Sequence, residues 1–432
     1  MSKNYKEYFK NKRVTVVGLG LLGKRLGDIA FLSECGAKVL VTDIKSAKDL
    51  APSVSKLKKY KNITYVLGEH RMEDFENCDM VLKGQGVALD SPYIAHARKN
   101  GIPVEMDESL FAKLAPEVKI IGVTGTRGKS TTTVLIYEIL KAAGLRVHLG
   151  GNIKGTAALP LLKEVKAGDT VVFELSSWQL QGFGDAKISP SISVFTNFMP
   201  DHMNYYKDDL KQYFTDKAYI YKFQKKNDIL ILGKGMKSLV KDAKGEIINT
   251  DVKKIPKGWK IGLKGAHNME NIAAALEVAK VMGIKEVVVK KAVENFKALS
   301  GRLELARTIR GVDIYNDTNS TTPEAGIAAL NSFKDNVILI MGGTDKGLDI
   351  KELLKVLKKK TKKIIMLPGT GSDRINIPRE EVANLKEAVS MAMKIAKKGD
   401  VVLFSPAFTS FGMFNNEYDR GEKFMKIIKA LK

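Results

Sequence analysis

Cysteine is scarce in this chain, since only Cys35 and Cys78 occur among 432 residues. Two cysteines cannot build a disulfide framework, and neither is grouped with histidines as a metal ligand would be. The apolar runs are no longer than strands, which excludes a helical membrane span. The first stretch, MSKNYKEYFKNKR, is polar and leads into a strand. We therefore expect no signal peptide, no integral membrane association and a cytoplasmic location.

Arginine is scarce as well, and none of the twelve arginines lies between Arg146 and Arg302. The formal net charge of +23 is therefore almost entirely an excess of lysine. The basic residues are spread along the chain without interleaved aromatics, so we expect no nucleic-acid partner. A lysine bias from genome composition or growth temperature ranks first as the explanation, and anionic substrates rank second. Where arginine is rare, each one is a better candidate for a bidentate contact.

Apolar strands alternate with helix-period stretches along the chain, a rhythm typical of parallel sheets with crossover helices. Three such α/β segments follow one another, beginning near VTVVGLG, KIIGVTG and Gly301. We place them at residues 1–112, 113–299 and 300–432. Because ligands of open parallel sheets bind outside the carboxyl ends of the strands, the polar loops that follow these strands are the candidate site.

The stretch IIGVTGTRGKSTT, residues 120–132, is a strand that enters a glycine-bordered loop and then a helix. Its backbone amides can cradle phosphates, Lys129 can reach the terminal ones, and the Ser130 hydroxyl can hold Mg²⁺. Five residues separate Gly122 from Gly128, one more than in the common phosphate loop. A chance glycine turn is the plainer interpretation, but Gly-Lys-Ser between a strand and an amphipathic helix favours a phosphate site.

Carboxylates and a histidine follow two further strands of the central segment. Glu174 ends VVFELSS, and Asp201-His202 follows VFTNFMP. A carboxylate at a strand end beside a phosphate loop is suited to Mg²⁺, and an imidazole beside a carboxylate is suited to metal ligation or proton transfer. The alternatives are a Glu–Lys pair at the sheet edge and a structural histidine.

A second glycine motif, GLGLLG, lies in the first segment, and Asp43 ends the next strand. Alone, Gly18, Gly20 and Gly23 with this aspartate predict a dinucleotide fold, although tight packing also requires small residues. With a second nucleotide loop at residue 124, the first segment is better interpreted as binding another nucleotide or a diphosphate.

Seven motifs in their order together resemble the Mur ligases: TGTRGKSTT, ELSSWQL, PDHMNYY, GAHNMENIAAA, LSGRLE, IYNDTNSTTPEA and SPAFTSFGMFNNEYDRGEKF. The resemblance covers nearly the whole chain. It implies a Rossmann-like UDP-substrate domain, a central phosphate-loop ATPase-type domain and a Rossmann-like C-terminal domain that binds the amino acid. It also implies a monomer that uses ATP to join D-glutamate to UDP-N-acetylmuramoyl-L-alanine through an acyl phosphate.

The resemblance assigns roles to residues by motif. ATP is assigned to Gly125, Thr126, Arg127, Gly128, Lys129, Ser130, Thr131, Asn268, Asn271, Arg302 and Asp317. Mg²⁺ is assigned to Ser130, Glu174, His202 and Lys217, the last as a carbamylated lysine, although composition alone makes Lys217 an ordinary surface residue. The UDP substrate is assigned to Gly18, Gly20, Leu21, Leu22, Asp43, Gly86, Asn152, Ser176 and Gln179. The amino acid is assigned to Thr321, Lys346, Ser410 and Phe411. The catalytic set is Lys129, Glu174, His202 and Lys217.

The chain departs from the family pattern at three places. Asn319 stands where the family has a lysine of the glutamate site, Glu417 stands at an aromatic position, and Gly84-Gln85-Gly86 replaces a Ser-Pro-Gly turn. Two alternatives therefore stay open. One is a Mur-type ligase for another amino acid or nucleotide-linked acceptor, and the other is a nucleotide-binding scaffold without ligase activity.

Overall fold

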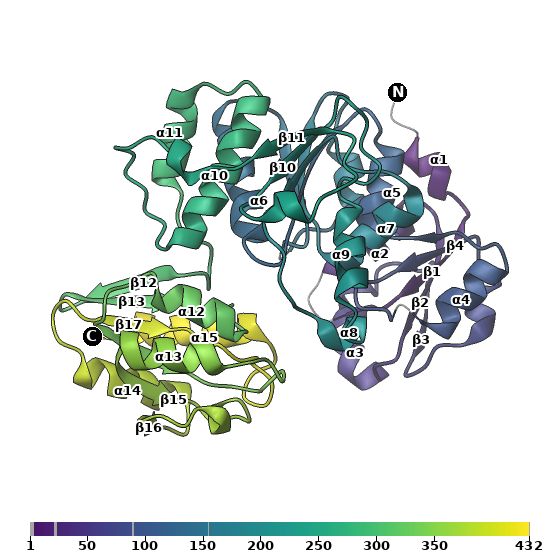
Figure 1. The fold of residues 1–432 in the computed structure, drawn as a ribbon. Helices are drawn as coiled ribbons and strands as arrows, with labels where there is room; N and C mark the ends of the chain where they lie inside the picture. Colours follow the sequence, from purple (N-terminus) through teal and green to yellow (C-terminus); the bar gives the residue numbers. More distant parts are fainter. Residues whose placement is uncertain (1–3, 21–23, 89, 154, 432) are drawn as a thin grey trace. The chain divides into compact units, whose positions relative to one another are not determined.

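The computed structural model describes residues 4–20, 24–88, 90–153 and 155–431, and its strands form three sheets (Figure 1). The chain divides into two compact units, Met1–Lys257 with Glu270–Val293, and Gly258–Met269 with Glu294–Lys432. The predicted α/β class with parallel sheets is confirmed, whereas the boundaries at 112/113 and 299/300 stay predictions. No helix in the described part of the chain is long and apolar enough to cross a bilayer.

The first sheet has the order β3-β2-β1-β4-β5, with every pair parallel. Its strands are β1 (Arg13–Val17), β2 (Lys38–Asp43), β3 (Ile63–Leu67), β4 (Met80–Lys83) and β5 (Val104–Glu105). Its helices are α1 (Tyr5–Phe9), α2 (Lys24–Glu34), α3 (Ala47–Leu57), η1 (Met72–Phe75), α4 (Pro92–Lys99) and α5 (Asp107–Leu114). The strand order reverses between β1 and β4, so the ligand crevice expected of such a sheet lies where these two strands end.

The second sheet has the order β11-β10-β9-β6-β8-β7 and is also parallel. Its strands are β6 (Lys119–Thr124), β7 (Val147–Gly151), β8 (Thr170–Glu174), β9 (Ile192–Phe195), β10 (Ile229–Leu232) and β11 (Glu246–Asn249). The helices in this part are α6 (Lys129–Ala142), η2 (Leu159–Lys163), α7 (Ser177–Ala186), α8 (Met203–Tyr206), α9 (Leu210–Ala218), η3 (Met236–Ser238), η4 (Val252–Lys254), α10 (Ala266–Val281) and α11 (Glu286–Asn295). The central position of β6 places the loop that follows it at the middle of the sheet edge.

The third sheet has the order β12-β13-β17-β14-β15-β16. Its strands are β12 (Glu304–Ile309), β13 (Val312–Asn316), β14 (Val337–Met341), β15 (Thr361–Met366), β16 (Glu380–Glu381) and β17 (Val401–Phe404). Its helices are α12 (Pro323–Leu330), α13 (Lys351–Lys360), η5 (Ser372–Arg374), α14 (Leu385–Ile395) and α15 (Glu417–Ala430). The edge strand β12 pairs antiparallel with β13, which the alternation of strands and helices did not predict.

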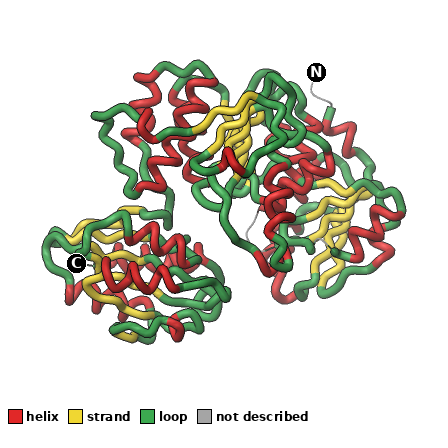
Figure 2. The backbone as a smooth tube through the Cα atoms, viewed as in Figure 1, coloured by secondary structure: helices red, strands yellow, loops and turns green. Residues whose placement is uncertain are grey.

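The third sheet is covered on both faces, so its central strands are buried throughout (Figure 2). Leu339 of β14 belongs to a core with Leu353 of α13, whereas the next residue, Ile340, belongs to a core with Phe424 of α15. Alternate side chains of a strand point to opposite faces, which explains why VILIM is an unbroken apolar run.

The first two sheets share one continuous hydrophobic core. Phe111 of α5 packs edge-on against Phe173 of β8, with 5.4 Å between the ring centroids. A buried hydrogen bond also connects the two domains. Lys83 Nζ, at the end of β4, donates to Gln181 Oε1 of α7 over 2.7 Å. The domain built on the first sheet and the domain built on the second sheet are therefore packed as one unit.

Candidate active site

The phosphate loop connects Thr124, the last residue of β6, to Lys129, the first residue of α6. Gly125 has a φ of +143° and Gly128 a φ of +83°, which are values that favour glycine. A β-carbon on Gly125 would lie 2.0 Å from Thr196 Oγ1, and one on Gly128 would lie 2.2 Å from Asn271 Oδ1. Both positions therefore require glycine for steric reasons.

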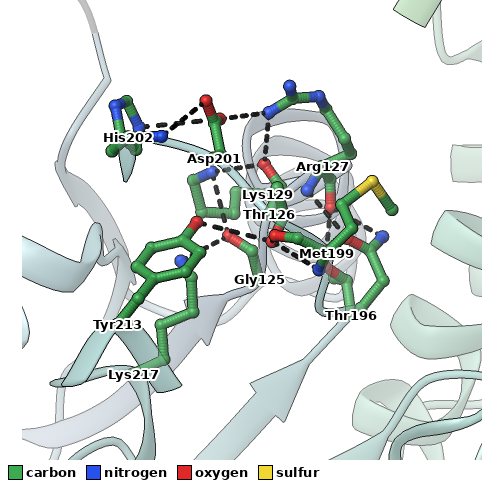
Figure 3. A network of polar contacts seen from close by, with 11 residues as sticks. Gly125, Thr126, Arg127, Lys129, Thr196, Met199, Asp201, His202, Tyr213 and Lys217 are labelled. Atoms are coloured by element: carbon green, nitrogen blue, oxygen red, sulfur yellow. Dashed lines mark hydrogen bonds and ion pairs between the residues drawn. The ribbon is translucent and has the colours of Figure 1, made fainter. Parts of the chain in front are cut away.

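Residues that follow β9 hold the loop in place (Figure 3). The amide of Thr126 donates to Asn197 O over 3.0 Å, and the amide of Arg127 donates to Asn197 Oδ1 over 2.8 Å. Thr196 Oγ1 donates to Arg127 O over 2.6 Å, and Met199 N donates to Thr126 Oγ1 over 3.1 Å. These protein–protein hydrogen bonds hold the loop in one conformation, as a preorganised electrostatic site requires.

Two lysines from different helices converge on one carbonyl of the loop, as Figure 3 shows. Lys129 Nζ donates to Gly125 O and Thr126 O, both over 3.1 Å, and Lys217 Nζ of α9 donates to Gly125 O over 2.8 Å. Lys217 is only 2% exposed, and its Nζ lies 4.7 Å from the centre of the Tyr213 ring. Burial, reinforced by the nearby charge of Lys129, lowers the pKa of Lys217 well below its ordinary value. Burial therefore favours the neutral form of its amine more than in an exposed lysine.

Asp201 and His202 lie at the other side of the loop. Asp201 Oδ2 forms an ion pair with Arg127 Nη1 over 2.6 Å, and His202 Nε2 lies 3.6 Å from the same oxygen. The imidazole packs on the Trp178 ring with 4.7 Å between centroids, and His202 has a left-handed φ of +56°. A non-glycine residue in this conformation marks a locally constrained site, and the contact with the Trp178 ring, whose plane is tilted by 50° to the imidazole, restricts the direction of the imidazole.

Glu174 ends β8, which pairs with β6 so that Glu174 lies opposite Val123, just before the loop. Its Oε1 accepts a hydrogen bond from Asn152 Nδ2 over 3.2 Å, whereas its buried Oε2 has no hydrogen-bond partner among the described residues. A buried carboxylate oxygen without a partner is costly, and a divalent cation would satisfy it. The donor set therefore fits Mg²⁺.

No three His, Cys, Asp or Glu side chains of the described residues gather closely enough to form a metal cage by themselves. Mg²⁺ does not need such a cage, because one or two protein ligands suffice when water and phosphate oxygens complete the octahedron. Ser130, at the start of α6, and Thr131 are both buried beside the loop and complete its helix end.

The glycine motif of the first sheet surrounds Asp43 at the end of β2. Asp43 Oδ2 accepts from the amide of Leu19 over 2.8 Å and from the amide of Gly20 over 3.4 Å. Gly18, Gly20 and Gly86 all have positive φ values. Asp43 thus holds the loop conformation, while Leu21, Leu22 and Gly23 lie outside the described residues.

In the C-terminal unit, Asp317 is buried at the end of β13. Its Oδ1 accepts from the amide of Leu303 over 3.0 Å, and its Oδ2 accepts from the Ser405 hydroxyl over 2.8 Å. Asp317 therefore holds the turn that carries Arg302. Burial raises the pKa of Asp317 to about 7.

Two neighbouring loops of the same unit carry residues assigned to the amino acid. Thr344 and Thr409 form a β-bridge, and Thr344 Oγ1 donates to Phe411 O over 2.6 Å. Lys346 and Phe411 are exposed, whereas Ser410 is buried and Thr321 is half-buried. The loop with Lys346 and the loop with Ser410 and Phe411 are thus brought together.

Family models match most of the chain. The Mur ligase MurD-like N-terminal domain matches residues 12–105, the Mur ligase middle domain matches residues 123–254, and the Mur ligase glutamate ligase domain matches residues 301–408. The chain belongs to the Mur ligase family. Curated relatives named UDP-N-acetylmuramoylalanine--D-glutamate ligase agree. The one from Roseiflexus sp. is 34% identical, with 97% of this chain and 98% of the relative covered. The one from Acetivibrio thermocellus is 33% identical, with 99% and 98% covered.

Solved Mur ligases share the fold of this family member. The UDP-N-acetylmuramate-alanine ligase MurC from Thermotoga maritima superposes with a TM-score of 0.61 at 18% identity, covering 98% of this chain and 100% of the other. The MurF ligase from Thermotoga maritima, solved in complex with ADP, also gives 0.61 at 20% identity, with 90% and 94% covered. The predicted family and three-domain architecture are confirmed.

Two residues assigned to the UDP substrate of this Mur ligase already have structural contacts. Ser176 and Gln179 form a capping box at the start of α7, and Gln179 Nε2 also donates to Glu108 Oε1. Gln179 is fully buried. Their contact with substrate stays a prediction, as does that of Asn152, whose amide faces Glu174.

Three buried polar residues of this Mur ligase were not predicted from sequence patterns. Arg420, 1% exposed, lies in the last of the seven motifs without an assigned role, and Lys83 and Asp216 lie outside the motifs. Lys83 Nζ donates to Gln181 Oε1, whose amide donates to Asp216 Oδ2 over 2.7 Å. Burial lowers the pKa of Lys83 to about 8 and raises the pKa of Asp216. The spacing of charges on helices and strands carries no signal for such a tertiary network.

We expect the Asp317→Asn substitution to remove a pH dependence of stability. A carboxyl whose folded pKa is raised from about 4 to about 7 stabilises the fold fully below pH 4, and this contribution is lost as the pH rises through 7. The amide preserves both hydrogen bonds, since Ser405 can accept instead of donate. In urea unfolding, the variant should gain a few kcal/mol over the parent at pH 8 compared with pH 4.5. An equal difference at both pH values would contradict the raised pKa.

Proposed function

We propose that this Mur ligase joins D-glutamate to UDP-N-acetylmuramoyl-L-alanine with the hydrolysis of ATP to ADP and phosphate, a step of peptidoglycan precursor synthesis. The name and full-length coverage of the curated relatives support the choice of substrates. The observation that carries the reaction class is the pair of lysines on Gly125 O. Nucleotide binding alone does not require a second, buried amine, that of Lys217, beside the phosphate loop.

The proposed reaction has two steps. A carboxylate oxygen of the acceptor attacks the γ-phosphorus of ATP, which forms an acyl phosphate and releases ADP. The amine nitrogen of D-glutamate then attacks the acyl carbon, loses a proton, and expels phosphate from the tetrahedral intermediate. The loop amides and Lys129 hold the transferred phosphoryl group and balance its charge, so the protein acts by positioning and electrostatics.

Mg²⁺ would be held by Ser130, Glu174 and His202. The ion supplies charge neutralisation for the phosphates when bound. Glu174 Oε2 is the best-supported ligand because it is buried without a partner among the residues described. His202 is oriented for the role by Trp178.

Lys217 is proposed to be carbamylated. The ammonium first loses one proton; the neutral amine then attacks carbon dioxide, a C–N bond forms as one C=O π bond breaks, and a second proton leaves the nitrogen, so that a cation becomes an anion with two oxygens. The lowered pKa of Lys217 favours this reaction, because only the unprotonated amine is nucleophilic. The product would serve as a further Mg²⁺ ligand.

The remaining assigned residues keep their proposed roles. Asn268, Asn271, Arg302 and Asp317 are proposed to serve ATP binding, the last by holding the turn of Arg302. Asn271 is supported by its position against Gly128. Thr321, Lys346, Ser410 and Phe411 are proposed for the amino acid, and Lys346 would supply the cation for its carboxylate.

An amino-acid panel in an ADP-release assay tests the proposal. With UDP-N-acetylmuramoyl-L-alanine and ATP present, we expect D-glutamate to stimulate ADP release most strongly. Reactions without acceptor, and the Lys129→Ala variant with all substrates, are the controls. Strong turnover with another amino acid and none with D-glutamate would reject the assignment. ATP binding without any substrate-dependent ADP release would favour the scaffold alternative.

One observation keeps a ligase for another amino acid as the second candidate. The Asn319 side chain donates to Ser300 O over 3.1 Å and supplies no cation to an amino-acid carboxylate. The same panel, with neutral and basic amino acids included, decides between the two.

A further inference from the structure

The turn from Ser300 to Leu303 carries Arg302 and is strained. Leu303 has a left-handed φ of +49° although it is a buried, branched residue, and Gly301 has a φ of +70°. A β-carbon on Gly301 would lie 2.6 Å from Thr318 Cγ2. A side chain disfavours this backbone conformation, so the surrounding contacts must hold it.

Side chains from one short segment, Asn316–Asn319, provide those contacts. Asn316 Nδ2 donates to Glu304 Oε2 over 3.2 Å, and the same carboxylate oxygen accepts from Gly301 N over 3.0 Å. Asp317 Oδ1 accepts from the amide of Leu303 over 3.0 Å. The turn is thus held near its start and at its end by Asn316, the last residue of β13, and by Asp317, which follows it.

Asn319 completes this arrangement with two hydrogen bonds. Its amide donates to Gly301 O over 3.0 Å, and its side-chain Nδ2 donates to Ser300 O over 3.1 Å. Its Oδ1 is buried and has no hydrogen-bond partner within the described ranges. The side chain of Asn319 is therefore bonded to Ser300, and its backbone amide is bonded to Gly301, the two residues that precede Arg302.

We propose that Asn319 is a positioning residue for ATP, which acts by holding the Ser300–Leu303 turn so that Arg302 is presented in one conformation. This role differs from that of a residue that contacts the amino acid. The proposal rests on the proposed function in one respect, namely that Arg302 contacts ATP.

The first test is a double-substitution cycle with steady-state kinetics. Asn319→Ala should raise KM for ATP about 5-fold, the usual effect of one lost hydrogen bond, and change KM for D-glutamate less than about 2-fold. When Arg302→Ala is already present, adding Asn319→Ala should cause no further rise, because both changes remove the same contact. Lys346→Ala is the contrast variant and should raise KM for D-glutamate alone. A raised KM for D-glutamate in Asn319→Ala, or additive effects on ATP, would overturn the proposal.

The second test needs no activity. Hydrogen exchange at the amides of Gly301 and Leu303 should be faster in Asn319→Ala while the melting temperature stays within about 2 °C of the parent. Unchanged exchange would overturn the proposal even for an active enzyme. An enzyme without D-glutamate-dependent turnover, but with faster exchange in the variant, would instead reject the proposed function and leave the role of Asn319 in holding the turn supported.

Discussion

The Lys217→Ala variant is expected to lose about 10³-fold in turnover. Short carboxylates such as acetate should restore part of the lost turnover. The buried amine donates to Gly125 O, the carbonyl that also binds Lys129, so its carbamate would lie beside the transferred phosphate. Alanine removes both the amine and the anion derived from it. A small carboxylate can occupy the vacated space and replace the lost oxygens. Steady-state ADP release at increasing acetate concentration measures the rescue.

Lys222→Ala is the matched control, because Lys222 lies just past the end of the same helix, α9, and is exposed. It should retain turnover near that of the parent. Carbon-13 NMR after exposure to labelled bicarbonate should show a carbamate signal in the parent and none in Lys217→Ala. Full activity of Lys217→Ala, or a loss that no carboxylate reverses together with an absent carbamate signal, would contradict the proposed modification.

The Glu174→Gln variant is expected to lose about 10²-fold in turnover and to need at least 10-fold more Mg²⁺ for half-maximal rate. The substitution preserves the shape of the side chain and its bond from Asn152, but it removes the charge from the unpartnered Oε2. Because Oε2 has no hydrogen-bond partner in the parent, the substitution breaks no existing hydrogen bond, and the free energy of unfolding should not fall. A magnesium titration of ADP release and a urea unfolding curve measure the two effects.

The exposed Glu246, on β11, provides the control for this substitution. Glu246→Gln should leave both the rate and the magnesium requirement unchanged. If Glu174→Gln lowered the rate without any change in the magnesium requirement, Glu174 would orient Asn152 and would not bind the ion.

Patterns within short stretches predicted the elements that carry the site. Apolar strands that end in polar residues located Asp43 and Glu174 at strand ends, and KELLKVLKKK corresponds to α13 over Lys351–Lys360. The β12 strand was not predicted because Glu304–Ile309 is an edge strand in which only Ile309 is buried, so it has no apolar run. Its pairing partner is adjacent in sequence, which breaks the strand–helix alternation used to recognise the segment.

The amino-acid composition around Lys217 could not predict that its side chain is buried. Its sequence neighbourhood, LKQYFTDKAYIYKF, is that of a surface helix, and only the family resemblance singled it out. Its burial arises from the packing of α9 against a loop some ninety residues earlier, where its Nζ meets Gly125 O. The left-handed backbone at His202 is equally a consequence of tertiary contacts.

The buried network at the packing of the first two sheets constrains how this protein can diverge. Lys83 and Asp216 come from different sheets' segments and are linked through Gln181. Loss of either charged group alone would leave the other buried without its counterpart, which typically costs several kcal/mol. During evolution, substitutions of Lys83 and Asp216 should therefore occur together. In a set of orthologues, an apolar residue at position 83 should coincide with an uncharged residue at position 216. Covariation of the two positions would therefore reflect the packing contact between the first two domains.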